Sequence, residues 1–282
     1  MTDIMDLKGR VALVTGARRG IGAAIAQRLA ANCASVILAG RTAQAEGLED
    51  VVARIRASGG VCQVLGFDVE DPAMRKGIIA EAEGFFGPID ILVNNAAFAG
   101  LWGPLSTVDS ATLLKGLQVN ALGPLDLIQQ CLPGMRARKY GRILNVTSGM
   151  ASQPAPPSPA AGAEFIRALA PYGVTKAAFD RMTTGLAAEL LGTGVRVNAV
   201  MPSNVAVTGA NSPGAMEILR RDPGRAEGME MMAEAAILLI CAPVTGLVMK
   251  SRDVLHLFDA PLHMLDGKTI MGDAHTIPDL PS

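Results

Sequence analysis

The chain has 282 residues, half of them hydrophobic, which is enough apolar material for one large core. Its 25 Lys and Arg residues nearly balance 26 Asp and Glu residues, for a formal net charge of −1. Because no basic excess is available to neutralise a phosphate backbone, nucleic-acid binding is not expected.

The cysteines and the N-terminus predict the cellular compartment of the protein. Four cysteines lie in apolar stretches without any CxxC pair: Cys33, Cys62, Cys131 and Cys241. We expect core thiols in a reducing cytosol, with neither disulfides nor a metal site. Residues 1–8 carry two acids and no long apolar run, so no secretory signal is predicted. No uncharged run reaches the roughly 20 residues of a membrane span, and we expect a cytoplasmic protein without membrane contact.

Short runs rich in Val, Ile and Leu alternate with longer segments of helical period, which is the pattern of βαβ units around a parallel sheet. The runs are almost continuously hydrophobic, as strands covered by helices on both faces must be. Six strands are predicted: Val11–Thr15, Ser35–Ala39, Val61–Gly66, Ile89–Val93, Arg142–Thr147 and Arg196–Val200. The sequence therefore predicts a single α/β domain over residues 1–282, a three-layer doubly wound parallel sheet.

Three segments depart from this alternation of predicted strands and helices. Residues 152–163 contain four prolines, and residues 203–228 contain several Pro-Gly and Ser-Pro pairs. Each follows a predicted strand, and ligands bind at the carboxyl ends of the strands in such sheets. We expect the first segment to form a wall of the substrate entrance and the second a substrate lid. The tail, residues 251–282, shows no clear period, and its three histidines (His256, His263 and His275) are expected to be solvated, without a metal site.

The first predicted strand leads into Thr15-Gly16-Ala17-Arg18-Arg19-Gly20-Ile21-Gly22 and then a helical run. Glycines at such a turn let the backbone approach a pyrophosphate, whose charge the helix N-terminus favours. Gly16, Gly20, Ile21 and Gly22 are thus candidate cofactor-binding residues. The alternative is a tight turn that needs glycine for packing only.

The end of the second predicted strand bears on the choice of cofactor. A free ribose 2′-hydroxyl would require an acidic residue near Ala39, but Arg41 follows instead. With Arg18 and Arg19 in the first loop, three guanidinium groups are available to bind a 2′-phosphate. The sequence favours NADP(H) over NAD(H), unless these arginines are only solvated loop charges.

Tyr172 and Lys176 are four residues apart in a predicted helix, so they share one helical face. An unperturbed tyrosine has a pKa of about 10, and a nearby cation would lower that pKa toward the range useful for acid-base catalysis. Such a pair is common by chance, and its neighbours must decide whether it is functional.

Those neighbours make the chain resemble the short-chain dehydrogenase/reductase family. The first loop matches the TGxxxGxG motif of that family, and Tyr172 with Lys176 matches YxxxK. Further matches occur in the same order between Lys8 and Pro202: Asp68-Val69, Asn94-Asn95-Ala96-Ala97, Val119-Asn120-Ala121, Asn145-Val146-Thr147-Ser148 and Arg196–Pro202. The resemblance implies a Rossmann fold and assembly into dimers or tetramers through the helices around Thr107–Cys131 and Tyr172–Leu191.

The resemblance also implies residue roles. Tyr172 would be the general acid/base, and Lys176 would lower its pKa and bind the nicotinamide ribose. Ser148 would hydrogen-bond the substrate oxygen, and Asn120 would hold a water in the proton relay. The remaining cofactor contacts would be Gly16, Gly20 and Gly22 at the pyrophosphate, Asp68 and Val69 at the adenine, Asn94 at the adenosine side and Thr208 near the nicotinamide. For Asn94, simple loop capping is the alternative.

Several positions depart from the family pattern. Ala97 replaces the glycine of NNAG, which is compatible with binding if its backbone is not in a glycine-only conformation. Ser203 replaces the glycine of the Pro-Gly pair after the sixth strand, which weakens the case for a Thr208 contact. The proline-rich segment lengthens the interval between Ser148 and Tyr172, and the glycine pair usual near the last strand is missing after Thr245–Met249.

Two functions remain from this reading. The first is an oxidoreductase that transfers a hydride between NADP(H) and a small-molecule ketone or alcohol. The second is a catalytically silent NADP-binding regulator or scaffold. The acid-base set of Tyr172, Lys176, Ser148 and Asn120 favours the first, since binding alone requires no acid-base group.

Overall fold

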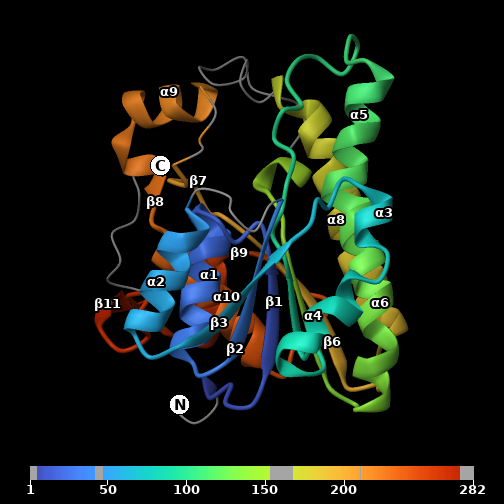
Figure 1. The fold of residues 1–282 in the computed structure, drawn as a ribbon. Coiled ribbons are helices and arrows are strands. Elements are labelled where there is room, and N and C mark those ends of the chain that lie inside the picture. The colour runs from blue at the N-terminus through green and yellow to red at the C-terminus, as the bar shows by residue number, and fades with distance from the viewer. Residues whose placement is uncertain (1–4, 42–46, 153–167, 210, 212, 274–282) are drawn as a thin grey trace.

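Seven parallel strands form the central sheet, in the order β3-β2-β1-β4-β5-β6-β9 (Figure 1). The computed structural model describes residues 5–41, 47–152, 168–209, 211 and 213–273. The strands are β1 (Val11–Thr15), β2 (Ser35–Gly40), β3 (Val61–Gly66), β4 (Ile91–Asn94), β5 (Gly141–Val146), β6 (Val195–Met201) and β9 (Val248–Lys250). The predicted single-domain, three-layer doubly wound fold is confirmed.

Helices cover both faces of the sheet, and each face has its own core. One core contains α1 (Gly20–Ala31), α2 (Leu48–Ala57), α10 (Met229–Cys241) and α11 (Ser251–Phe258). The other contains α4 (Ile78–Phe86), α6 (Gly123–Ala137) and α8 (Ala170–Glu189), with α3 (Pro72–Arg75) and α5 (Ser110–Leu117) on the same side. In β1, Ala12 and Val14 enter the first core while Val11 and Leu13 enter the second. This alternation explains why the strand is hydrophobic at every position.

All six predicted strands are present, with small differences at their ends. The largest difference is at β4, which begins at Ile91 rather than Ile89. Asp90 is buried just before it, and its carboxylate accepts a hydrogen bond from the backbone N–H of Val11 at 3.3 Å. The backbone N–H of Asp90 also donates to the carbonyl oxygen of Val11 at 2.9 Å, so backbone pairing continues one residue before β4.

The tail contains regular structure that the sequence analysis did not assign. Helix α11 buries Ser251, Val254 and Leu255, a helical spacing that eight residues are too few to reveal. Asp259 caps its C-terminus with a left-handed φ of 44°. The antiparallel strands β10 (Pro261–His263) and β11 (Ile270–Asp273) follow. His263 packs against Glu234 of α10, so the expectation of a solvated side chain is wrong for this histidine.

The two predicted loop segments have different outcomes. Residues 203–228 contain β7 (Val205–Ala206), α9 (Pro213–Arg221), a 3₁₀ turn (Pro223–Arg225) and β8 (Ala226–Glu227). Strands β7 and β8 pair in parallel and so close the base of this segment, which we call the lid segment. Apart from Ser152, the proline-rich residues 152–163 lie outside the described residues.

The expectations about the cysteines, membrane spans and metal sites can be compared with the structure. All four cysteines are free, but Cys33 is exposed in the turn after α1, with a φ of 69°, so its assignment to the core was wrong. None of the described helices is long and apolar enough to cross a membrane. Within the described part of the chain, no group of three or more His, Cys, Asp or Glu side chains could hold a metal ion. His275 lies outside that part.

Candidate active site

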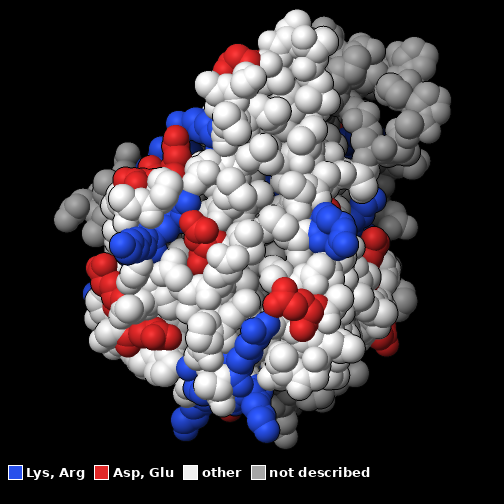
Figure 2. Space-filling model, turned by 90° about the vertical axis from the view of Figure 1, so that its right-hand side faces the viewer, with Lys and Arg blue, Asp and Glu red and all other residues white. Residues whose placement is uncertain are grey.

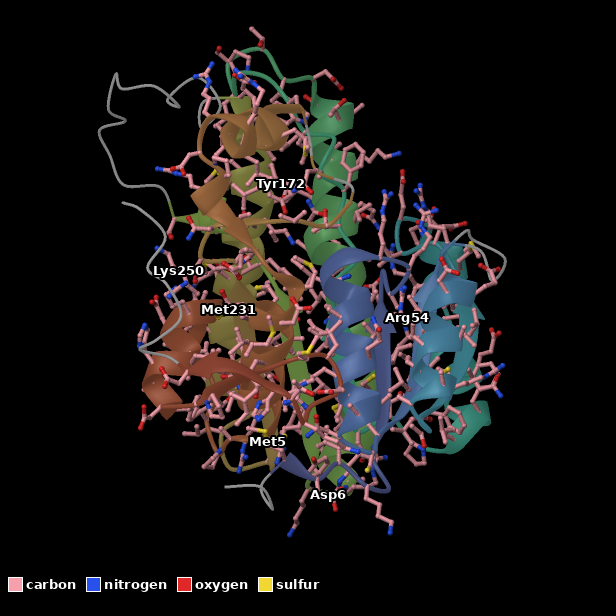
Figure 3. The ribbon with its side chains drawn as sticks, turned by 90° about the vertical axis from the view of Figure 1, so that its left-hand side faces the viewer. Met5, Asp6, Arg54, Tyr172, Met231 and Lys250 are labelled. Carbon is pink, nitrogen blue, oxygen red and sulfur yellow. The ribbon has the colours of Figure 1, made fainter. Side chains whose placement is uncertain are left out.

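A cavity of about 850 Å³ lies at the carboxyl ends of the central strands. This is the edge at which open α/β sheets bind ligands. Figure 3 shows Tyr172 on the upper part of α8, beside the lid segment and far from Met5 and Asp6 at the opposite end. The predicted residues that line the cavity are Gly16, Arg18, Arg19, Gly20, Ile21, Arg41, Asp68, Val69, Ser148, Tyr172, Lys176 and Thr208.

The glycine loop between β1 and α1 requires glycine at three positions. Gly16 and Gly20 have φ values of 65° and 58°, which favour glycine. A Cβ on Gly20 would lie 2.8 Å from the Cβ of Thr208, so the lid segment passes directly over the loop. Gly22 lies outside the lining, because a Cβ there would collide with the side chain of Asn95 and the carbonyl oxygen of Gly16. Its role is to let α1 pack closely beneath the loop.

Asn95 fixes this loop, a role that the sequence analysis did not assign. Its Nδ2 donates to the carbonyl oxygens of Thr15 and Gly16, both at 3.0 Å. The Thr15 hydroxyl oxygen in turn accepts hydrogen bonds from the backbone N–H groups of Asn95 and Ala96, at 3.0 and 3.1 Å. The end of β4 therefore holds the glycine loop in place from the side.

The three arginines predicted to recognise a phosphate do converge. Arg18, Arg19 and Arg41 all line the cavity, although they come from two different loops. The cavity also reaches Asp68 and Val69 after β3, where the resemblance placed an adenine. A cofactor with a phosphate at this end would meet guanidinium groups from two directions.

The proton-transfer residues are positioned by the first turns of α8. Gly173 packs against the short helical turn Gly149–Ala151, where a Cβ would approach the carbonyl oxygen of Met150 to 2.6 Å. That turn is capped by Ser148, whose Oγ accepts the backbone N–H of Met150 at 3.2 Å. Close packing at Gly173 thus brings Ser148 and Tyr172 into the same wall of the cavity.

The electrostatics of this wall differ from the expectation. Burial raises the pKa of Tyr172 to about 12, and a hydrogen bond with Ser148 acts in the opposite direction. Burial also lowers the pKa of Lys176 to about 8, and its Nζ donates to the carbonyl oxygen of Val146 at 2.9 Å, 5.8 Å from the Tyr172 ring centre. The predicted lowering of the Tyr172 pKa by Lys176 is therefore not found in this structure, where desolvation dominates and only Ser148 acts against it.

Asn120 and Asn94 are buried and lie outside the cavity lining. Asn120, in a π-helical turn, accepts the backbone N–H of Phe98 at 2.7 Å and donates to the Phe98 carbonyl oxygen and to the Thr175 hydroxyl. Asn94 donates to Asn145 Oδ1 at 3.0 Å and so links β4 to β5. The bracing expected of Asn94 is present, whereas its expected adenosine contact is not supported. The water-holding role of Asn120 stays a prediction, and its side chain positions the loop that carries Phe98.

Two departures from the family pattern have structural explanations. Ala97 is absent from the residues with positive φ, so alanine is accommodated there without strain. Ser203 caps the start of α11, because its Oγ accepts the backbone N–H of Arg252 at 2.9 Å and lies 3.0 Å from the hydroxyl of Ser251. Thr208 nevertheless lines the cavity, and its expected contact near the nicotinamide stays a prediction.

Several lining residues carry no sequence signal that would have identified them. Phe98 and Trp102 come from the loop after β4, and Lys115 comes from α5. Lys115 is paired with Glu70 at 3.0 Å and lies over the Phe98 ring at 5.2 Å. These residues line the same cavity as Tyr172, and only the packing of distant segments brings them there.

Comparison with known proteins agrees with this site. The profile of the short chain dehydrogenase family matches residues 10–215. A short chain dehydrogenase of Pseudocercospora fijiensis is 33% identical over 252 residues, covering 84% of this chain and 77% of that protein. The ketoacyl reductase HetN of Nostoc sp. is 32% identical over 203 residues, covering 72% and 66%. The solved structure of a 3-oxoacyl (acyl-carrier-protein) reductase from Agrobacterium tumefaciens, with NADP bound, gives a TM-score of 0.76 at 32% identity, covering 89% and 95%.

Proposed function

Because the chain belongs to the short-chain dehydrogenase family of oxidoreductases, we propose that it transfers a hydride between NADP(H) and a carbonyl or alcohol, with Tyr172 as the general acid/base. One observation carries the proposal. A single cavity is lined by Tyr172, Lys176 and Ser148 at one end and by the glycine loop and three arginines at the other. A dinucleotide needs both ends, whereas a small polar ligand would need only one.

The chain fits a dinucleotide on its own geometry. The glycine loop borders the cavity where α1 begins, and the N-terminus of a helix favours a pyrophosphate. The nicotinamide supplies the hydride when the cofactor is bound. Asp68 and Val69 would hold the adenine, and Lys176 would hold the ribose nearest the reacting centre.

In the reduction direction, the substrate carbon gains the hydride and its oxygen gains the proton of the Tyr172 hydroxyl. Tyr172 is protonated at neutral pH, since its pKa is raised to about 12. Ser148 would donate a hydrogen bond to the substrate oxygen and orient it toward Tyr172. The apolar wall formed by Phe98, Trp102 and Leu169 would exclude water from the reacting carbon.

NADP(H) is favoured over NAD(H) by charge. Arg18, Arg19 and Arg41 line the cavity, and β2 ends without an acidic residue that would bind a free 2′-hydroxyl. The NADP bound to the Agrobacterium reductase supports the same choice. A catalytically silent cofactor-binding protein is the competing function, and turnover distinguishes the two.

The test compares two tyrosine variants, because the chain has only two tyrosines. Tyr172→Phe removes the proton donor and should lower kcat by about 10²- to 10⁴-fold, with NADPH affinity unchanged within a few-fold. Tyr140→Phe is the matched control, since Tyr140 lies under Arg10 and Arg142 and does not line the cavity. NADPH oxidation is followed at the absorbance of the reduced nicotinamide, with a panel of ketones. Equal rates for Tyr172→Phe and the parent would contradict the mechanism.

A further inference from the structure

Two buried polar atoms next to the proposed catalytic centre have no hydrogen-bond partner other than each other. These atoms are Oδ1 of Asp180 and Oγ1 of Thr147, and a hydrogen bond with Thr147 lowers the pKa of Asp180. A buried acceptor with so few partners costs stability, and such groups are rare enough to require an explanation. Thr147 immediately precedes Ser148, and Asp180 lies on the helix that carries Tyr172, so the explanation is to be sought in the site itself.

The geometry connects Asp180 to Lys176. The two residues are one helical turn apart on α8, a spacing that places them on the same face. Lys176 is 2% exposed and donates to the carbonyl oxygen of Val146, the residue before Thr147 in the chain. The end of β5 and one face of α8 thus enclose an ammonium group and a carboxylate together.

Each of the two groups affects the charge of the other. Burial is the main influence on both, lowering the pKa of Lys176 to about 8 and raising the pKa of Asp180. The Asp180 carboxylate raises the pKa of Lys176, and the Thr147 hydroxyl and then the Lys176 ammonium lower that of Asp180. Each charge therefore compensates part of the desolvation cost of the other.

The other titratable group beside Lys176 is Tyr172, which is neutral at physiological pH. Other charged side chains on the elements packed against α8 are bound elsewhere or exposed. Arg142 of β5 donates to the carbonyl oxygens of Gly141 and Gly194, and Arg196 of β6 donates to that of Ala242. Lys115 of α5 is paired with Glu70, and Lys250 of β9 lies at the outer edge in Figure 3. Among the described residues, Asp180 therefore supplies the negative charge for Lys176.

We propose that Asp180 is a positioning residue that keeps Lys176 protonated in the working pH range, and this role rests on the proposed function. Without the carboxylate, the buried ammonium would lose its proton at lower pH. Neutral Lys176 would bind the ribose more weakly and would no longer favour developing negative charge on the Tyr172 oxygen. Asp180 thus sets the upper pH limit of the reduction without touching substrate or cofactor.

The test measures two quantities across pH 6–10 for the parent and for Asp180→Asn. These are kcat/KM for ketone reduction and the dissociation constant of NADPH from fluorescence titration. The parent should lose reduction activity as pH rises through about 8, where Lys176 deprotonates. In Asp180→Asn that limit should move down by about one pH unit, and NADPH affinity should weaken over the same range. Asp180→Glu should move the limit back toward the parent value.

Glu189→Gln is the matched control, because Glu189 is on the same helix but is 60% exposed and paired with Arg136. Its pH profile should match that of the parent. If Asp180→Asn does not fold, Asp180→Ser replaces it, with the smaller side chain leaving room for a water. Superimposable pH profiles for the parent and the neutral Asp180 variant would overturn the role of Asp180. A parent without Tyr172-dependent turnover would overturn the proposed function instead, and the NADPH titration would still decide the role of Asp180.

Discussion

Arg41 is the residue at which cofactor preference is best tested. It is exposed at the end of β2, lines the cavity and faces a site that would hold the 2′-phosphate. Arg41→Asp places a carboxylate there, and the loss of charge-assisted hydrogen bonds should weaken NADPH binding by roughly 10- to 100-fold. NADH binding should be unchanged or stronger, since a carboxylate can accept from a free 2′-hydroxyl.

Lys139→Asp is the control for the change of charge. Lys139 is exposed in the turn before β5, and its φ of 53° suits aspartate. Titration of both variants with NADPH and NADH should show an altered preference for Arg41→Asp alone. Equal NADPH and NADH affinities in the parent would show that the three arginines do not recognise the 2′-phosphate.

At the scale of elements, a buried ion pair attaches the C-terminal hairpin and α10 to α1. Arg28 of α1 donates to Glu234 of α10 at 2.9 Å, and these side chains are 2% and 0% exposed. The same carboxylate oxygen lies 3.0 Å from Nδ1 of His263 in β10 and accepts its backbone N–H. Three elements that are far apart in the sequence therefore share one carboxylate.

Removing the Glu234 carboxylate should lower the stability of the folded protein. Glu234→Gln leaves the buried Arg28 guanidinium without its paired carboxylate, which should lower the free energy of unfolding by about 3–5 kcal/mol. Urea denaturation measures the change. The control is Glu189→Gln, which breaks an exposed pair and should cost no more than about 1 kcal/mol. Equal losses for both variants would show that burial does not strengthen the Arg28 pair.

At the scale of the whole molecule, one side of the protein is poor in charge. Figure 2 views the side of α5, α6 and α8, and much of its surface belongs to uncharged residues. Exposed apolar side chains occur on these helices and the segments next to them: Leu105, Leu114, Leu122, Val174 and Leu191. Exposed apolar side chains on neighbouring helices are typical of subunit interfaces, which supports the expected homodimer or homotetramer.

Leu114→Glu tests this surface, because Leu114 is 64% exposed on α5 and a charge there would be buried by a partner. Light scattering should give an assembly of two or four 29.2 kDa chains for the parent and a smaller species for the variant. Val61→Glu is the control, since Val61 is 52% exposed on the edge strand β3, outside these helices. A monomeric parent would contradict the prediction.

Local patterns in the sequence were sufficient to predict the sheet and most of the cofactor site. Val11–Thr15 is hydrophobic at every position because both faces of β1 are covered, and the glycines after it follow from one strand-to-helix turn. Tyr172 and Lys176 share a face by helical spacing alone. Tertiary structure decided what depends on distant segments: Asn95 beside the glycine loop, Ser203 on α11, His263 on Glu234 and Thr147 on Asp180. It also decided the pKa of Tyr172, because desolvation depends on everything packed around a group, and no spacing within one helix reports it.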